Sequence, residues 1–146
     1  MKIYWVTGQP GCGKTELGKF FKKSWPYTFQ IDGDDIREIY QNKDYSEEGR
    51  RENVETAQII AKFISRTGHV PIITMVSPYR DQREEFKKNN DVVEVYLHTT
   101  DIRGREEFFV PNYELPLENF IDLDSTGLTV EELFNNLMIK LKGNIY

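Results

Sequence analysis

The amino-acid sequence predicts an α/β fold, in which a parallel sheet of about five strands is flanked by helices. Segments patterned as strands alternate with segments patterned as helices along the chain. Residues 70–76 are almost all apolar, as in a parallel strand that is covered on both faces. A glycine-rich loop at residues 8–15 separates a β-branched, aromatic segment from an amphipathic one. Crossovers between parallel strands are right-handed, and ligands bind beyond the carboxyl ends of such strands.

In the first half of the chain, strands are expected at 2–7 and 27–31, and helices at 16–23, from 34 towards Tyr40, and from 46 onward. Pro26 ends the first helix, because proline disfavours helical geometry in the residue before it. Asp34 or Asp35 is expected to cap the short helix, and Ser46 to cap the long one. Gly68 suits the carboxyl-terminal cap of the long helix.

In the second half, strands are expected at 70–76, 92–97 and 120–123, and helices at 79–88 and from 129 onward. Ser77 is expected to cap the helix at 79–88, with Pro78 in its first turn. Thr129 and Glu132 have the spacing of a capping box, which begins the last helix. Residues 100–117 show no clear period.

Composition predicts a single globular domain over residues 1–146, with 38% hydrophobic and 29% charged residues. The net charge of −5 argues against a general affinity for nucleic acid, although local arginines can still hold a small anion. Cys12 is the single cysteine, which excludes an internal disulfide and is typical of a reducing compartment. No signal peptide or membrane span is indicated, so we expect a cytoplasmic protein without a membrane partner.

The glycine-rich loop matches the phosphate-binding pattern G-x-x-x-x-G-K-[ST] of P-loop NTPase folds. Its glycines let backbone N–H groups surround an anion, while Lys14 reaches the β- and γ-phosphates and the Thr15 hydroxyl suits Mg²⁺. The alternative is a chance glycine-rich turn, but a strand pattern before it and a helix pattern after it favour a nucleoside-triphosphate site. The expected ATP-binding residues are Gly8, Gln9, Pro10, Gly11, Cys12, Gly13, Lys14 and Thr15.

Three acids, Asp32, Asp34 and Asp35, follow the second expected strand, at the same sheet edge as the loop. Phosphoryl transfer needs a carboxylate at the attacking hydroxyl and others that hold Mg²⁺, often through water. Helix capping alone would need only one of these acids. We therefore expect a functional role, with Arg37 one turn further along and facing the same cleft.

A second anion-favouring position follows the third expected strand, where Ser77 and Pro78 begin a helix. A capping role would fully explain Ser77. Arg80 is harder to explain, because a cation in a first helical turn opposes the helix dipole unless an anion binds nearby. Arg50 and Arg51, near the start of the long helix, raise the same question.

Five segments together resemble the adenylyl-sulfate kinase family: 8–15, 32–37 (DGDDIR), 45–53 (YSEEGRREN), 76–80 (VSPYR) and 113–116 (YELP). That family has D-G-D-N-x-R, F-S-x-x-D-R-x-E-N and I-S-P-Y-R segments at similar intervals. The resemblance spans nearly the whole chain and implies a single P-loop kinase domain. It implies transfer of the ATP γ-phosphate to the 3′-hydroxyl of adenosine 5′-phosphosulfate with Mg²⁺, in sulfate assimilation. Family members are commonly dimeric, which implies a homodimer.

The resemblance also implies roles for individual residues. Asp34 and Lys14 would be catalytic, with Asp34 at the attacking hydroxyl, and Thr15 and Asp32 would hold Mg²⁺. Tyr45 stands where the family has a phenylalanine that stacks on the substrate adenine, and an aromatic replacement keeps a stacking face. The implied substrate-binding residues are Asp34, Arg37, Tyr45, Arg50, Asn53, Ser77, Arg80, Phe108 and Phe109.

Three features depart from the family pattern. Asp35 replaces an asparagine, and Gly49 replaces an aspartate. The family's Arg-Asp-x-Lys-Gly-Leu-Tyr lid is represented only by the shorter segment 99–109, in which Arg103 and Arg105 would supply the ATP-binding cations. Phe108 or Phe109 would supply the second ring that stacks on adenine. A short lid weakens the exclusion of water.

Two other functions remain open from the sequence. A 5′-hydroxyl polynucleotide kinase also combines a Gly-x-Pro-Gly-x-Gly-Lys loop with an Asp-Asp-x-Arg segment, as at 34–37. A catalytically inactive nucleotide-binding protein would bind nucleotide without turnover.

Overall fold

The computed structural model describes residues 1–101 and 106–143. A five-stranded parallel sheet has the order β2-β3-β1-β4-β5, which confirms the predicted fold class. The strands are β1 (Ile3–Thr7), β2 (Thr28–Asp32), β3 (Val70–Thr74), β4 (Val92–His98) and β5 (Phe120–Asp124). The helices are α1 (Lys14–Ser24), α2 (Gly33–Tyr40), α3 (Glu47–Arg66), α4 (Arg80–Asn89) and α5 (Val130–Lys142), with a 3₁₀ turn at Glu106–Phe108.

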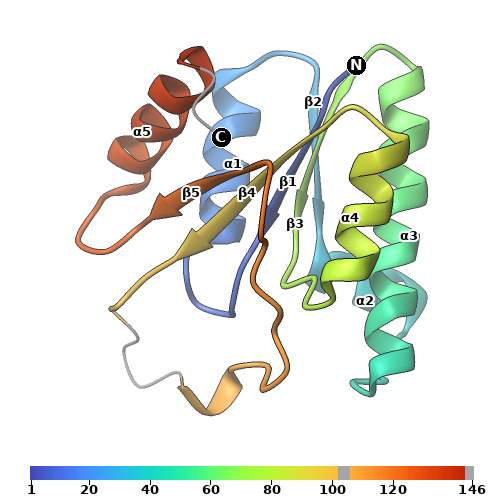
Figure 1. The fold of residues 1–146 in the computed structure, drawn as a ribbon. Coiled ribbons are helices and arrows are strands. Elements are labelled where there is room, and N and C mark those ends of the chain that lie inside the picture. Colours follow the sequence, from blue (N-terminus) through green and yellow to red (C-terminus); the bar gives the residue numbers. More distant parts are fainter. Residues whose placement is uncertain (102–105, 144–146) are drawn as a thin grey trace.

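The helices form a layer on each face of the sheet (Figure 1). α1 and α5 cover one face, over a core that includes Leu17, Phe21 and Leu137. α3 and α4 cover the other face, where Trp5, Ala57 and Phe86 are packed. Because β1 lies in the middle of the sheet and is buried along its length, its carboxyl end is a rigid support for the loop that follows it.

The residues that cap α2 and α4 differ from those expected. β2 continues to Asp32, so Asp32 rather than Asp34 or Asp35 caps α2, and its side chain accepts a hydrogen bond from the Asp34 backbone N–H. Ser77 does not cap α4, whose N-cap is Tyr79. The Ser77 hydroxyl oxygen instead accepts from the indole N–H of Trp5, a tertiary contact that a local pattern does not reveal.

Other local predictions are confirmed. Thr129 and Glu132 form the capping box of α5, and Ser46 caps α3 through the Gly49 N–H. Gly68 follows the end of α3 with a left-handed φ of +84°, which is the usual role of glycine there.

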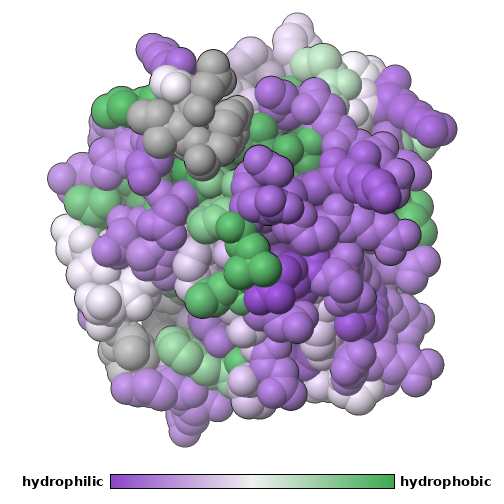
Figure 2. Space-filling view, viewed as in Figure 1, coloured by the Kyte–Doolittle hydropathy of each residue, from purple (hydrophilic) through white to green (hydrophobic). Residues whose placement is uncertain are grey.

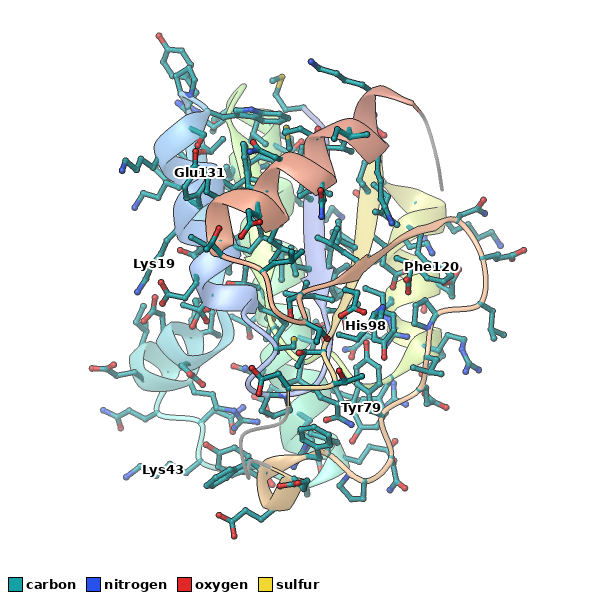
Figure 3. All side chains as sticks on the ribbon, turned by 90° about the vertical axis from the view of Figure 1, so that its left-hand side faces the viewer. Lys19, Lys43, Tyr79, His98, Phe120 and Glu131 are labelled. Carbon is teal, nitrogen blue, oxygen red and sulfur yellow. The ribbon has the colours of Figure 1, made fainter. Side chains whose placement is uncertain are left out.

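The surface seen from the direction of Figure 1 is mostly hydrophilic, with hydrophobic side chains gathered in separate groups (Figure 2). No helix among the described residues has both the length and the apolar character needed to span a membrane. In Figure 3, Lys43 and Tyr79 lie at the lower end of the molecule, towards which the strands point in Figure 1. The loops at this end of the sheet surround the cavity described next.

Candidate active site

A cavity of about 320 Å³ opens at the carboxyl ends of β1, β2 and β3. Its volume lies in the range of small-molecule sites. Most of the residues expected at the site line it: Pro10, Gly11, Lys14, Thr15, Asp32, Asp34, Arg37, Tyr45, Arg50, Asn53, Ser77 and Phe108. Gly8, Gln9, Cys12, Gly13, Arg80 and Phe109 are not among its lining residues. Arg103 and Arg105 lie outside the described residues.

The loop after β1 has the geometry of an anion cradle. Gly8 has φ +153°, and a Cβ there would lie 2.2 Å from the carbonyl oxygen of Leu97, so only glycine fits against β4. Gly13, with φ +100°, is the N-cap of α1, and the helix begins at Lys14. The positive end of α1 therefore faces the cavity, as in sites that bind phosphate.

Lys14 is held by the loop itself, since its Nζ donates to the carbonyl oxygen of Gln9 over 2.8 Å. Burial lowers the pKa of Lys14, because the ammonium has lost most of its water. Burial likewise raises the pKa of the Cys12 thiol, which packs in the core behind the loop. These features suit Lys14 for contact with an anion and make Cys12 a structural residue.

Asp32 connects three elements around the cavity. Its Oδ1 accepts from the hydroxyls of Thr15 and Thr74, each over 2.8 Å, and its Oδ2 accepts from the N–H of Asp34 over 3.3 Å. One carboxylate beside one hydroxyl is the kind of oxygen donor set on which Mg²⁺ relies when water and phosphate complete its shell. No group of three or more His, Cys, Asp or Glu side chains suited to a metal occurs in residues 1–101 and 106–143. The residues present therefore fit Mg²⁺ bound together with a nucleotide.

Asp34 lies in the first turn of α2, and its side chain is exposed at the cavity. Its neighbour Asp35 is also exposed but does not line the cavity. The two acids are adjacent and both exposed, but only Asp34 lies at the cavity, because successive side chains leave α2 in different directions.

Two arginines surround the ring of Tyr45. The Arg37 guanidinium lies 4.0 Å from the ring centroid, and that of Arg50 lies 5.9 Å away. Arg37 also donates to the carbonyl oxygens of Asn42 and Asp44, and Arg50 donates to that of Tyr45. This side of the cavity combines positive charge with an aromatic face, which suits an anionic nucleotide.

Asn53 is 5% exposed and points a donor at the Gly33 carbonyl oxygen over 3.3 Å. Its Oδ1 is buried and has no hydrogen-bond partner among the described residues. Because an unpaired buried acceptor costs free energy, this atom is open to a hydrogen bond from a bound molecule or from water.

Gly49 has a structural reason to depart from aspartate. A Cβ on Gly49 would lie 2.2 Å from the carbonyl oxygen of Asp44 and 2.4 Å from its Cγ. The Asn42 side chain also donates to the Gly49 carbonyl oxygen over 3.0 Å. Residues 41–46, which carry Tyr45, therefore pack directly on the first turn of α3.

The segment between β4 and β5 is tied to the phosphate loop at residue 110. The side-chain amide of Gln9 donates to the carbonyl oxygen of Val110 over 3.0 Å and accepts from its N–H over 2.9 Å. Phe108, which is 63% exposed, lies next to this point and lines the cavity. Gln9 thus reaches this segment rather than the cavity.

The other expected anion contacts lie away from the cavity. The Arg80 Nε donates to the carbonyl oxygen of Leu115 over 2.7 Å. Arg51 makes ion pairs with Glu47 and Asp81. Both arginines are thus engaged by protein groups near the starts of their helices.

Sequence reasoning missed one buried ion pair close to the site. Arg83 and Glu94 are both fully buried and joined over 2.9 Å. The signal was a single acid, Glu94, in an otherwise apolar strand pattern, since a charge in a covered strand needs a partner.

Comparison with known proteins identifies relatives across most of the chain. Residues 1–107 match the family model described as "Adenylylsulphate kinase". The chain is 31% identical to the adenylyl-sulfate kinase of Pseudomonas aeruginosa, over 84% of this chain and 69% of that protein. It is 28% identical to the bifunctional enzyme NodQ of Rhizobium meliloti, over 66% of this chain, but spans only 16% of that longer protein.

The fold resembles that of solved kinases. The structure of the Mycobacterium tuberculosis APS kinase CysC in complex with AMPPNP and APS has a TM-score of 0.78, with 20% sequence identity, over 97% of each chain. At this identity the likeness concerns the fold, and it agrees with the parallel sheet described above.

Proposed function

The chain belongs to the adenylylsulphate kinase family, and from this premise we propose that it transfers the γ-phosphate of ATP to the 3′-hydroxyl of adenosine 5′-phosphosulfate. One observation carries the proposal. The phosphate-loop residues Lys14 and Thr15 line the same cavity as Arg37, Arg50 and Asn53. A triphosphate and an anionic nucleotide can therefore meet between them.

On the donor side, the backbone N–H groups at the start of α1 and the Lys14 ammonium hold the β- and γ-phosphates. Thr15 and Asp32 would hold Mg²⁺, directly or through water, since their 2.8 Å hydrogen bond already brings the two oxygens together. When bound there, the metal would supply positive charge that offsets the negative charge of the phosphate oxygens. Arg103 and Arg105 would contribute further positive charge to ATP.

On the acceptor side, Arg37, Arg50 and Asn53 hold the phosphosulfate nucleotide, and Asp34 accepts the proton of its 3′-hydroxyl. The hydroxyl oxygen then bonds to the γ-phosphorus as the bond to the ADP oxygen breaks. Tyr45 stacks on the adenine, with one ring face already covered by Arg37. Ser77 and Phe108, which line the same cavity, would complete the substrate site.

The test of this function measures ADP release with three additions: adenosine 5′-phosphosulfate, a 5′-hydroxyl oligonucleotide, and no acceptor. We expect stimulation by the phosphosulfate alone. Stimulation by the oligonucleotide alone would assign a polynucleotide kinase instead. ATP binding without release of ADP under any condition would assign an inactive nucleotide-binding protein.

A variant pair tests the acceptor carboxylate. Asp34→Asn is expected to lower kcat by at least about 100-fold while ATP binding stays measurable, because positioned acid–base groups contribute roughly 10²–10⁴-fold. Asp35→Asn is the matched control, since that neighbouring acid is exposed but does not line the cavity. Near-full turnover of Asp34→Asn would exclude Asp34 from this role.

A further inference from the structure

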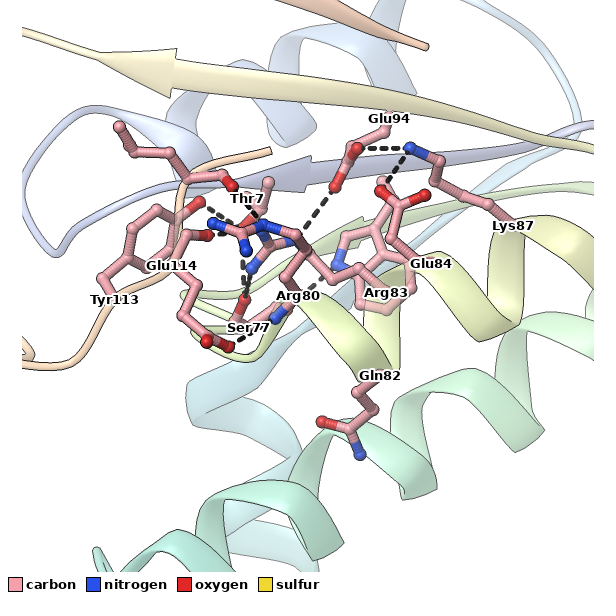
Figure 4. Close-up of polar contacts among 12 residues, drawn as sticks. Thr7, Ser77, Arg80, Gln82, Arg83, Glu84, Lys87, Glu94, Tyr113 and Glu114 are labelled. Carbon is pink, nitrogen blue, oxygen red and sulfur yellow. Dashed lines mark hydrogen bonds and ion pairs between the residues drawn. The ribbon is translucent and has the colours of Figure 1, made fainter. Parts of the chain in front are cut away.

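Arg83 is a fully buried cation on α4, and its guanidinium binds in three directions (Figure 4). Its Nε donates to Glu94 Oε2 over 2.9 Å. Its Nη1 donates to the carbonyl oxygen of Ser77, and its Nη2 donates to that of Glu114. One side chain thus joins β4, the loop between β3 and α4, and the segment between β4 and β5.

Neutralising Glu94 does not by itself require Arg83. The Nζ of Lys87 already donates to Glu94 Oε1 over 2.8 Å, and it is paired with Glu84 over 2.9 Å. A cation that served only to balance charge could be a lysine. The two remaining nitrogens of Arg83 donate to backbone carbonyl oxygens, so they fix the positions of two backbone segments rather than balance a charge.

The first of these carbonyls belongs to a residue that lines the cavity. Ser77 has φ +48°, in the left-handed region that is unfavourable for residues with a side chain. It also precedes Pro78, which restricts its backbone further. Such a conformation persists only where surrounding contacts hold it, and here Trp5 binds the Ser77 side chain while Arg83 binds its carbonyl.

The second carbonyl belongs to a segment tied to the phosphate loop. Tyr113, next to Glu114, forms a 2.8 Å hydrogen bond with the hydroxyl of Thr7, the residue before Gly8. Burial raises the pKa of Tyr113 well above its ordinary value, so the phenol keeps its proton. The Glu114 N–H also donates to the Pro78 carbonyl oxygen over 2.9 Å. Arg83 therefore binds at the point where Ser77, which lines the cavity, is connected through residues 113–114 to Thr7, the residue before the phosphate loop.

We propose that Arg83 is a positioning residue for phosphoryl transfer, which holds the Ser77 wall of the cavity and the 113–114 segment in register with the phosphate loop. It touches no substrate. The proposal rests on the proposed function for its kinetic readout. Without Arg83, the backbone of Ser77 relaxes, and the acceptor loses its alignment with the γ-phosphate.

The test uses variants that separate charge balance from position. Arg83→Met combined with Glu94→Gln removes the ion pair without leaving an uncompensated buried charge, since Lys87 keeps its contact with Glu84. Arg83→Lys keeps the cation but cannot bridge two carbonyl oxygens and a carboxylate. Lys87→Met is the control, because it removes the other cation from Glu94 without touching the cavity wall.

We expect the double variant and Arg83→Lys to lower kcat/KM for adenosine 5′-phosphosulfate by roughly tenfold to 100-fold, since small misplacements near reacting groups cost about this much. The KM for ATP should stay within about threefold, and Lys87→Met should keep wild-type kinetics. A kcat/KM within twofold of wild type in the folded double variant would overturn the proposal.

A second readout does not depend on the activity. In a Trp25→Phe background, Trp5 is the remaining tryptophan, and it donates to the Ser77 hydroxyl over 3.0 Å. Loss of Arg83 should shift its emission, whereas Lys87→Met should not. If the wild-type protein does not phosphorylate adenosine 5′-phosphosulfate, the proposed function fails. An unchanged Trp5 emission in the Arg83 variants then overturns the positioning role independently.

Discussion

Gly49→Ala tests whether the packing of residues 41–46 on the first turn of α3 positions the acceptor. An alanine Cβ at this position would lie 2.2 Å from the carbonyl oxygen of Asp44, and contacts below 3.0 Å are essentially never found for Cβ atoms. Residues 41–46 must therefore move by at least 0.8 Å, the difference between these two distances. This displacement changes the positions of Tyr45 and of the Asp44 carbonyl oxygen to which Arg37 donates.

The two consequences have opposite signs. Alanine improves the intrinsic helix propensity of α3 by about 1 kcal/mol relative to glycine. Against this gain, the contact at 2.2 Å is with a backbone oxygen, which cannot rotate away as the end of a side chain can, so relieving it costs about 1–3 kcal/mol. A shift approaching 1 Å at a binding group costs on the order of 10²-fold in reactivity. We expect the midpoint of thermal unfolding to fall by roughly 2–6 °C, because the cost of the contact exceeds the gain in helix propensity, with kcat/KM for adenosine 5′-phosphosulfate lowered roughly tenfold to 100-fold.

The assay combines thermal unfolding followed by circular dichroism with steady-state kinetics for both substrates. Thr56→Ala is the matched control, because it also places alanine in α3 but breaks only a hydrogen bond to the Glu52 carbonyl oxygen within the helix. This control should leave the kinetics unchanged. A Gly49→Ala protein with wild-type kcat/KM would show that the packing of residues 41–46 on α3 does not position the acceptor.

Two further predictions concern the phosphate loop and its support. Burial lowers the pKa of Lys14 in the free protein, and bound phosphates raise it again, so nucleotide binding should take up a proton between the lowered pKa and the ordinary lysine value. Calorimetry in buffers of different ionisation enthalpy measures this uptake, and its absence at every alkaline pH would contradict the assignment. In the same window the unfolded state binds more protons than the folded state, so the contribution of Lys14 to the free energy of unfolding rises with pH. Gly18→Ala should destabilise the protein by about 1–3 kcal/mol in urea unfolding, because its Cβ would lie 2.5 Å from Gln30 Nε2 and 2.7 Å from Thr74 Cγ2. Gly33→Ala, with its nearest contact at 3.4 Å, is the control, and equal stability of the two variants would refute the packing argument.

The order of strands and helices along the chain was predictable because the sequence pattern of each element is local. Each strand and helix has its own hydrophobic period, and the phosphate loop has its own pattern. Parallel topology then follows from the alternation of elements, and it brings residues 8–15, 32–37 and 77–78 to one sheet edge. For these reasons most of the expected site residues do line one cavity.

The error at Ser77 has a clear physical origin, which is competition between a local cap and a distant partner. Ser77 has the sequence of a helix cap, yet Trp5, 72 residues away, binds its hydroxyl, and Arg83 binds its carbonyl. At Asp32 the local and distant contacts coexist, because one carboxylate oxygen caps α2 while the other accepts from the hydroxyls of Thr15 and Thr74. Such choices depend on contacts between segments far apart in the chain.

By itself, the sequence determined the order of the elements, the phosphate loop and the segments that gather at the edge of the sheet, since all of these follow from local periods and spacing. Only the tertiary structure decided which side chains face the cavity and which support it. It placed Asp34 at the cavity and Asp35 away from it, packed Asp44 against Gly49, and buried Arg83 behind Ser77. The reason is that burial and hydrogen bonding are shared between segments, so no single segment contains the information that sets them.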